Sequence, residues 1–136
     1  MIQLLVVDDD DINIFLLKHL LRKSTQPLDI ASFVNPAEAL KYISLCIDEG
    51  KRIDLLLLDI NMPQMSGWDL LNELRIDGVS TIKESHIYML SSSVHASDSE
   101  KAEQFPEVSG FISKPVTLEF LTNVFSIIVA AKQAKC

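Results

Sequence analysis

The stretch IDLLLLDINMP at residues 53–63 decides the fold. Its first part, Ile53–Asp59, is a short apolar run closed by an acid, which is typical of a strand buried on both faces of a parallel sheet. The loop that follows, Asn61–Gly67, contains Pro63 and Gly67, both of which favour a break in regular structure. A second run of the same kind, Ile2–Asp8, opens the sequence. Two such strands predict a parallel sheet with helices on both faces.

Working outward, strands and helices alternate along the whole chain. Further strands are predicted at Leu28–Phe33, His86–Ser91 and Val108–Ser113. Five helices are predicted, at about Asp11–Lys23, from the cap Asn35 to Glu49, from the cap Ser66 to Asp77, at Ser97–Phe105 and at Thr117–Lys132. The second and fifth strands carry the most polar residues, which edge strands tolerate best. The sequence therefore predicts a doubly wound, five-stranded parallel α/β sheet in the order 2-1-3-4-5.

Apolar side chains at helical spacing predict how two of the helices face the sheet. In the first helix, Ile12, Leu16 and Leu20 form one stripe, with Phe15 beside it. In the last helix, the stripe consists of Leu121, Val124, Phe125 and Ile128. We expect both stripes to pack against the strands.

Composition limits the class of protein. The length of 136 residues and the hydrophobic content of 48% fit a single domain, residues 1–136, with a sizeable core. A formal net charge of −7 argues against direct binding to nucleic acid. The apolar runs are too short to span a bilayer, and no basic leader precedes the first strand. Cys46 and Cys136 have no metal-binding spacing, so we expect free thiols in the cytoplasm.

The strand ends predict where the chemistry lies. In an open parallel sheet, ligands bind beyond the carboxyl ends of the strands. These ends carry Asp8 and Asp9, Asp59, Ser91 and Lys114. Three carboxylates held together repel one another, so such a site must take up a proton or a cation, and oxygen ligands suit Mg²⁺. A metal, an ammonium and a hydroxyl together can hold a phosphoryl group, and a carboxylate can be its nucleophile.

At these residues the sequence closely resembles the response-regulator receiver family, over essentially its whole length. The matching motifs are VDD at 7–9, LDINMP at 58–63 followed by Gly67, MLSS at 89–92 and GFISKP at 110–115. Each motif alone is weak, but their order, spacing and positions at strand ends are specific. The resemblance implies a flavodoxin-like fold.

The resemblance also implies the roles of the acidic residues. Asp59 is the expected phosphoacceptor. Asp9 and Asp59 are expected to bind Mg²⁺ directly, together with the backbone carbonyl of Asn61, while Asp8 is expected to act through a metal-bound water.

Further roles concern the phosphoryl group and the response to it. Ser91 is expected to donate a hydrogen bond to the phosphoryl group and Lys114 to pair with it, with a cis bond before Pro115. Phe111 is the expected switch aromatic, packing inward when Ser91 moves. Asn61 and Ser93 occupy positions that modulate hydrolysis in this family. Ser91 and Phe111 stand where many members have Thr and Tyr.

As a receiver, the chain is expected to be mainly a signalling switch. It would take its phosphoryl group from a phosphohistidine of a sensor histidine kinase or a histidine phosphotransfer protein. It would then change its surface between Ser97 and Lys132 toward an unidentified downstream protein. Its own chemistry would be limited to Mg²⁺-dependent self-phosphorylation from donors and to autodephosphorylation. A monomer or a phosphorylation-dependent dimer is expected.

Two alternatives stay open. The residues Asp8-Asp9-Asp10 contain the Asp-x-Asp spacing of Mg²⁺-dependent phosphatases with an aspartyl nucleophile, such as haloacid-dehalogenase-like hydrolases. Those enzymes usually carry a cap insertion, which this length does not accommodate. The chain is also compatible with either a stand-alone regulator or a piece of a larger protein.

Overall fold

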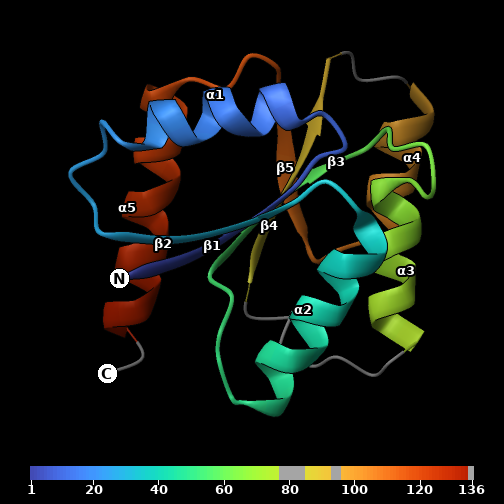
Figure 1. Ribbon diagram of the computed structural model, residues 1–136, viewed down its shortest axis with the longest axis horizontal. Coiled ribbons are helices and arrows are strands. Elements are labelled where there is room, and N and C mark those ends of the chain that lie inside the picture. Colours follow the sequence, from blue (N-terminus) through green and yellow to red (C-terminus); the bar gives the residue numbers. More distant parts are fainter. Residues whose placement is uncertain (77–84, 93–95, 135–136) are drawn as a thin grey trace.

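The computed structural model describes residues 1–76, 85–92 and 96–134 (Figure 1). Strands and helices alternate in the order β1 (Ile2–Val7), α1 (Asp11–Leu21), β2 (Leu28–Phe33), α2 (Pro36–Asp48), β3 (Leu55–Asp59), α3 (Gly67–Ile76), β4 (His86–Ser91), α4 (Ala96–Gln104), β5 (Val108–Ser113) and α5 (Leu118–Ala134). The strands form one five-stranded sheet in the order β2-β1-β3-β4-β5, and all four pairings are parallel. The predicted fold class is confirmed.

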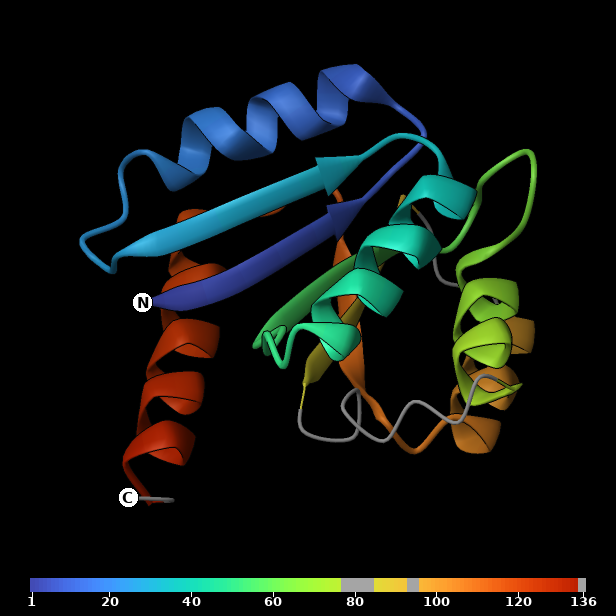
Figure 2. The ribbon, with the colours of Figure 1, turned by 60° about the horizontal axis from the view of Figure 1, so that its bottom comes forward.

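The sheet separates two hydrophobic clusters. Helices α1 and α5 cover one face, and α2, α3 and α4 lie on the other (Figures 1 and 2). Side chains alternate along the central strands, so Leu56 and Leu58 of β3 point to the α2–α3 side while Leu55 and Leu57 point to the α1–α5 side. Every residue of β3 is buried. The edge strands β2 and β5 are mostly half-buried, as their polar residues predicted.

Polar caps start three of the helices, and two of these caps, Asn35 and Ser66, were predicted. The Asp10 side chain accepts a hydrogen bond from the Ile12 amide at 3.0 Å, and the Asn35 side chain accepts one from Ala37 at 2.9 Å. At α3, the Asp69 amide donates to the Ser66 hydroxyl at 3.1 Å, and the Ser66 amide donates to the Asp69 carboxylate at 3.0 Å. These caps satisfy backbone groups that a helix start leaves unpaired.

The predicted stripe of α1 is wrong. Ile12, Phe15 and Leu16 are 65%, 66% and 57% exposed, and the buried face of α1 consists of Ile14, Leu17 and Leu21. Leu20 is only partly buried. The helix carries apolar residues all round, so two stripes of helical spacing exist and periodicity cannot choose between them. By contrast, the stripe predicted for α5 is confirmed, since all four of its residues are buried.

A buried carboxylate, Asp54, links the first residues of the chain to helix α5 at the amino-terminal edge of the sheet. Asp54 is 2% exposed, and it accepts a hydrogen bond from the Gln3 amide at 2.8 Å. Its second contact is the Lys132 ammonium of α5 at 2.9 Å, and Lys132 also donates to the Met1 carbonyl at 2.9 Å. This contact lies at the amino ends of the strands, away from the edge where the carboxyl ends meet. Among the described residues, no helix has both the length and the apolar character needed to cross a bilayer.

The close packing of α3 on β3 gives a testable prediction about Gly67. A Cβ atom added there would lie 2.6 Å from the Asp59 carbonyl oxygen and 2.8 Å from the Met89 Cε. We therefore expect Gly67→Ala to lower the free energy of unfolding by about 1–3 kcal/mol through overpacking, as measured by urea denaturation.

Gly110→Ala is the matched control for this substitution. Its added Cβ would meet the Tyr88 ring at 3.5 Å, an ordinary van der Waals contact, so the expected change in unfolding free energy is about 0.5 kcal/mol or less. Equal effects of the two substitutions would show that the backbone at Gly67 can move away from Asp59 without loss.

Candidate functional site

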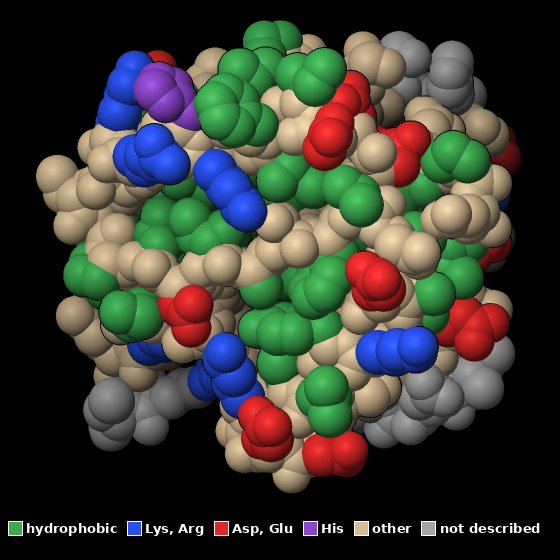
Figure 3. All heavy atoms as spheres, viewed as in Figure 1, with side chains coloured by type: hydrophobic (Ala, Val, Ile, Leu, Met, Phe, Trp, Pro, Cys, Tyr) green, Lys and Arg blue, Asp and Glu red, His purple; other side chains and the backbone are tan. Residues whose placement is uncertain are grey.

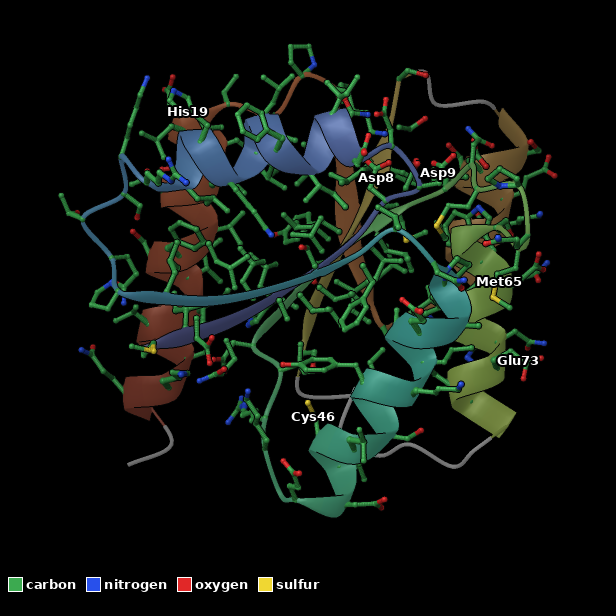
Figure 4. The ribbon with its side chains drawn as sticks, viewed as in Figure 1. Asp8, Asp9, His19, Cys46, Met65 and Glu73 are labelled. Carbon is green, nitrogen blue, oxygen red and sulfur yellow. The ribbon has the colours of Figure 1, made fainter. Side chains whose placement is uncertain are left out.

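Three carboxylates meet at the carboxyl edge of the sheet. Asp8 and Asp9 follow directly on β1, and Asp59 is the last residue of the neighbouring strand β3. One carboxylate oxygen from each of the three lies within 4.8 Å of the other two. Figure 4 shows Asp8 and Asp9 between the start of α1 and the loop that enters α3. Asp8 and Asp59 are 2% and 4% exposed, whereas Asp9 is open to solvent.

Lys114 brings a positive charge into this cluster from β5. Its ammonium lies 3.0 Å from Asp8 Oδ2 and 3.4 Å from Asp59 Oδ1, so it bridges the two buried carboxylates. The backbone holds it there, because the Lys114 amide donates to the Ser91 carbonyl at 2.9 Å. The peptide bond between Lys114 and Pro115 is cis, as the resemblance implied.

The electrostatics of the site make Asp59 easier to protonate than an ordinary aspartate. Burial, followed by the negative charge of Asp8, raises the pKa of Asp59 from 3.8 to about 7, although Lys114 acts in the opposite direction. Burial alone would lower the pKa of Lys114. The hydrogen bond and the charge of Asp8, together with Asp59, outweigh burial and raise it. Lys114 therefore stays charged, and its single positive charge is fewer than the three carboxylates of the cluster.

The arrangement fits a divalent cation. Two of the three carboxylates are buried, and the third, Asp9, is exposed to water. Burial and the charge of Asp8 raise the pKa of Asp59, and a cation bound to these oxygens would offset their mutual repulsion. Oxygen donors of this kind are the ligands of Mg²⁺, which keeps several waters and takes few carboxylates.

Asp10 does not join the carboxylate cluster. Its side chain caps α1, and its amide donates to Asp8 Oδ1 at 2.9 Å. The second acid of the Asp-x-Asp spacing is thus used in starting a helix. This observation weakens the phosphatase alternative, which requires that acid next to the nucleophile.

The remaining predicted residues lie around the cluster. Ser91 is buried at the end of β4, and Asn61 is exposed, its amide 3.4 Å from Asp59 Oδ1. Phe111 of β5 is half-buried and meets the Trp68 ring edge-on, with the ring centroids 6.1 Å apart. Ser93 lies outside the residues that the structure describes.

Sequence reasoning missed two features beside the site. The first is the close contact of Gly67 with the Asp59 backbone, for which the glycine after Pro63 was the available signal. The second is a hydrogen bond from Trp68 Nε1 to Asp98 Oδ1 at 3.2 Å, which joins α3 to α4. No sequence spacing indicates that pair, because its partners are 30 residues apart.

Comparison with known proteins gives one consistent family. The model of the response regulator receiver domain matches residues 4–126. A 3',5'-cyclic-nucleotide phosphodiesterase, regA, of Dictyostelium discoideum is 30% identical over 88% of this chain and 14% of its own length. The sensory/regulatory protein RpfC of Xanthomonas campestris is 28% identical over 96% of this chain and 17% of its own length. The chain thus spans only a small part of these relatives.

Solved structures agree with the sequence matches. A two-component response regulator from Cytophaga hutchinsonii superposes with a TM-score of 0.85 at 29% identity, over 94% of this chain and 96% of that one. One from Legionella pneumophila gives a TM-score of 0.81 at 25% identity, over 96% of this chain and 99% of that one.

The raised pKa of Asp59 predicts a pH-dependent gain in stability for Asp59→Asn when divalent cations are removed. Because the pKa of Asp59 in the folded protein exceeds its ordinary value, the folded state binds more protons, and its stability falls as pH rises from about 4 to about 7. The asparagine variant avoids this loss. We expect it to be more stable than the wild type by about 1 kcal/mol or more at pH 8, in urea denaturation with a chelator.

At pH 5 the difference between variant and wild type should shrink, because the wild-type carboxyl is then mostly protonated. A difference of the same size at both pH values would contradict the assigned pKa.

Proposed function

The chain belongs to the response regulator receiver domain family of two-component systems, and we propose that it is a phosphorylation switch whose phosphoacceptor is Asp59. The observation that carries the proposal is the meeting of Asp8, Asp9 and Asp59 within 4.8 Å, with Lys114 bridging two of them. A buried carboxylate beside a fixed ammonium and two further carboxylates that can bind a cation has the surroundings of a nucleophile for phosphorus. We propose that residues 1–136 form a single domain.

The proposed reaction is one displacement at phosphorus. A carboxylate oxygen of Asp59 forms a bond to phosphorus while the bond from phosphorus to the imidazole nitrogen of a donor phosphohistidine breaks. The imidazole leaves with the bonding electron pair and takes up a proton from solvent. Hydrolysis of the resulting acyl phosphate by water returns the Asp59 carboxylate and inorganic phosphate.

The metal role is assigned to the acidic cluster. Asp9 and Asp59 would bind Mg²⁺ directly with the backbone carbonyl of Asn61, and Asp8 would hold a metal-bound water. When bound, the ion would neutralise charge on the phosphoryl oxygens. Asp8 in addition holds Lys114 at 3.0 Å.

Residues at the end of β4, in β5 and directly after β5 would bind the phosphoryl group and respond to it. Lys114 would pair with one oxygen, and the Ser91 hydroxyl would donate to another. Phe111 is the proposed switch aromatic, and its edge contact with Trp68 at 6.1 Å places it beside α3. The responding surface would be α4, β5 and α5. Asn61 and Ser93 would tune the rate of hydrolysis.

The named relatives support a proposal about the phosphodonor of this protein. Those relatives include a sensory/regulatory protein and a hybrid signal transduction histidine kinase, in which a receiver-like segment belongs to a histidine kinase system. We propose that a sensor histidine kinase or a histidine phosphotransfer protein is the donor, and that the protein works in the cytoplasm. The response would go to a downstream protein, by a monomer or by a dimer that forms on phosphorylation.

Phosphorylation from a small donor tests the proposed site. Wild-type protein incubated with Mg²⁺ and acetyl phosphate should gain one phosphoryl group in intact-mass spectrometry, and a chelator should abolish the gain. Asp59→Asn should gain none, because it lacks the nucleophile. Asp11→Asn, which removes an exposed acid from the first turn of α1, is the matched control and should behave as wild type.

An adduct that persists in Asp59→Asn would overturn the site assignment. Repeated turnover of p-nitrophenyl phosphate by the wild type would favour the phosphatase alternative instead. A gain of one phosphoryl group in mass, without repeated turnover of p-nitrophenyl phosphate, supports the proposed phosphorylation switch.

The metal assignment predicts a separate effect for Asp9→Asn. Asp9 is the exposed member of the cluster, so the substitution removes one charge and one ligand without leaving a buried group unpaired. We expect the Mg²⁺ dissociation constant from isothermal titration calorimetry to rise by about tenfold or more, with the urea unfolding midpoint in chelator nearly unchanged. Unchanged Mg²⁺ affinity would remove Asp9 from the ligand set.

A further inference from the structure

A cavity of about 160 Å³ lies between helix α1 and the segment that joins β5 to α5. Its apolar walls come from β1, α1, β4 and that segment, and they belong to or pack against the hydrophobic cluster of the α1–α5 face: Val6, Ile14, Leu17, Leu20, Leu90 and Val116. Leu16, which is 57% exposed, also lines the cavity and lies where it meets solvent. Voids of this size are uncommon in a packed core, so the cavity is a candidate binding site.

The polar lining of the cavity gathers at one end. Helix α1 runs back along the sheet from its carboxyl edge, so Asn13 in the first turn lies near that edge and Leu20 in the last turn lies at the opposite end (Figure 2). Asp8 and Lys114 also line the cavity, and both belong to the charged cluster at the carboxyl edge. A molecule in the cavity would therefore place its apolar part along α1 and its polar part toward these three residues.

The charges at the polar end disfavour an ion. Asp8 and Lys114 pair with each other at 3.0 Å, so an anion would meet a carboxylate there and a cation would meet an ammonium. Taking a charge out of water without a partner of its own is costly. Asn13 carries an amide, and a hydroxyl or amide group of a ligand can both donate to and accept from such neighbours. The polar end therefore fits an uncharged group.

The volume sets the size of the apolar part. An engineered cavity of about 150 Å³ with walls of Leu, Ile and Phe binds benzene. The cavity under α1 has nearly the same volume and aliphatic walls, so it accommodates a six-membered ring with a short substituent. Removing such a ring from water supplies the affinity, and the polar group fixes its orientation.

We propose that this cavity is a binding site for a small uncharged amphiphile, which consists of an aromatic ring or branched alkyl group of about six to eight non-hydrogen atoms and one hydroxyl or amide group. The apolar part lies between α1 and Val116, and the polar group reaches Asn13 and the Asp8–Lys114 pair. The inference is independent of the proposed function, because binding requires neither Mg²⁺ nor a phosphoryl group.

NMR titration of the full chain measures this binding directly. Methyl resonances of the wild type are followed as benzyl alcohol is added, in chelator and without a phosphodonor. Toluene has the ring but no polar group, whereas benzoate and benzylamine carry opposite charges. The four probes therefore separate the effects of size, polarity and charge.

Three variants test the two ends of the cavity. Leu16→Trp and Leu20→Trp each place a larger side chain in the apolar wall. Ile127→Trp, at a position on α5 that is 53% exposed and does not line the cavity, is the matched control. Asn13→Leu removes the amide and leaves the apolar walls in place.

We expect saturable shifts in the methyl groups of Leu17, Leu20 and Val116, with a dissociation constant of about 1 mM or below for benzyl alcohol. Benzoate and benzylamine should bind at least about tenfold more weakly, because each brings a charge to the polar end.

The variants should separate the apolar and polar contributions. Leu16→Trp and Leu20→Trp should raise the dissociation constant of benzyl alcohol by about tenfold or more, because the added ring takes the space of the ligand, and Ile127→Trp should bind as the wild type does. Asn13→Leu should weaken benzyl alcohol by about three- to tenfold through the loss of a hydrogen bond, without weakening toluene.

Three results would overturn the inference. Shifts that do not saturate, or that are confined to the exposed Ile12 methyl groups, would indicate contact with the surface of α1 alone. Wild-type affinity for benzyl alcohol in folded Leu16→Trp and Leu20→Trp would show that the ligand lies elsewhere. Binding of benzoate or benzylamine as tight as that of benzyl alcohol would exclude the assigned class of ligand.

Discussion

Repulsion among Asp8, Asp9 and Asp59 is the constraint on which the rest of the structure depends. The parallel sheet brings their carboxylates within 4.8 Å of one another and buries two of them. Lys114 offsets part of this charge by bridging Asp8 and Asp59, yet the pKa of Asp59 stays near 7. The fold therefore holds three carboxylates against their mutual repulsion with one nearby ammonium. A cation next to these oxygens, or a proton on Asp59, restores the balance.

Holding such a site in place requires rigid surroundings. Asp59 ends a strand whose five residues are all buried, and Gly67 lets α3 approach the backbone of that residue closely. The Lys114 amide is fixed to the Ser91 carbonyl across β4 and β5. Each charged group thus sits on a strand end or directly after one, where the sheet restricts its movement. Exposed apolar side chains lie away from this edge on α1, where Ile12, Phe15 and Leu16 are exposed, and Figure 3 shows hydrophobic side chains along the top, where α1 lies in Figure 1.

The sequence predicted most of the fold and the members of the site, for identifiable reasons. Strand ends could be located from apolar runs closed by an acid, and the rule for parallel sheets then brought Asp8, Asp9, Asp59 and Lys114 together. The helix caps Asn35 and Ser66 were readable because their side chains act within three residues. The buried face of α1 was predicted wrongly, because Ile12-Leu16 and Ile14-Leu17-Leu21 both have helical spacing. Choosing between them needs the direction in which the chain leaves β1, which is tertiary information. The Trp68–Asp98 hydrogen bond could not be predicted either, because its partners lie 30 residues apart in the sequence.

Helices α5 and α4 are attached to the rest of the structure in different ways. Helix α5 buries Leu121, Val124, Phe125 and Ile128, and exposing each such side chain costs about 1.5–3 kcal/mol. Couplings between sites are typically about 1–3 kcal/mol in total, which is small beside the cost of exposing all four of these side chains. Among the described side chains of α4, Asp98 is buried and Ala102 is half-buried, and Asp98 accepts a hydrogen bond from Trp68 at 3.2 Å. The attachment of α4 through its described side chains is therefore more polar than the attachment of α5 to the opposite face of the sheet.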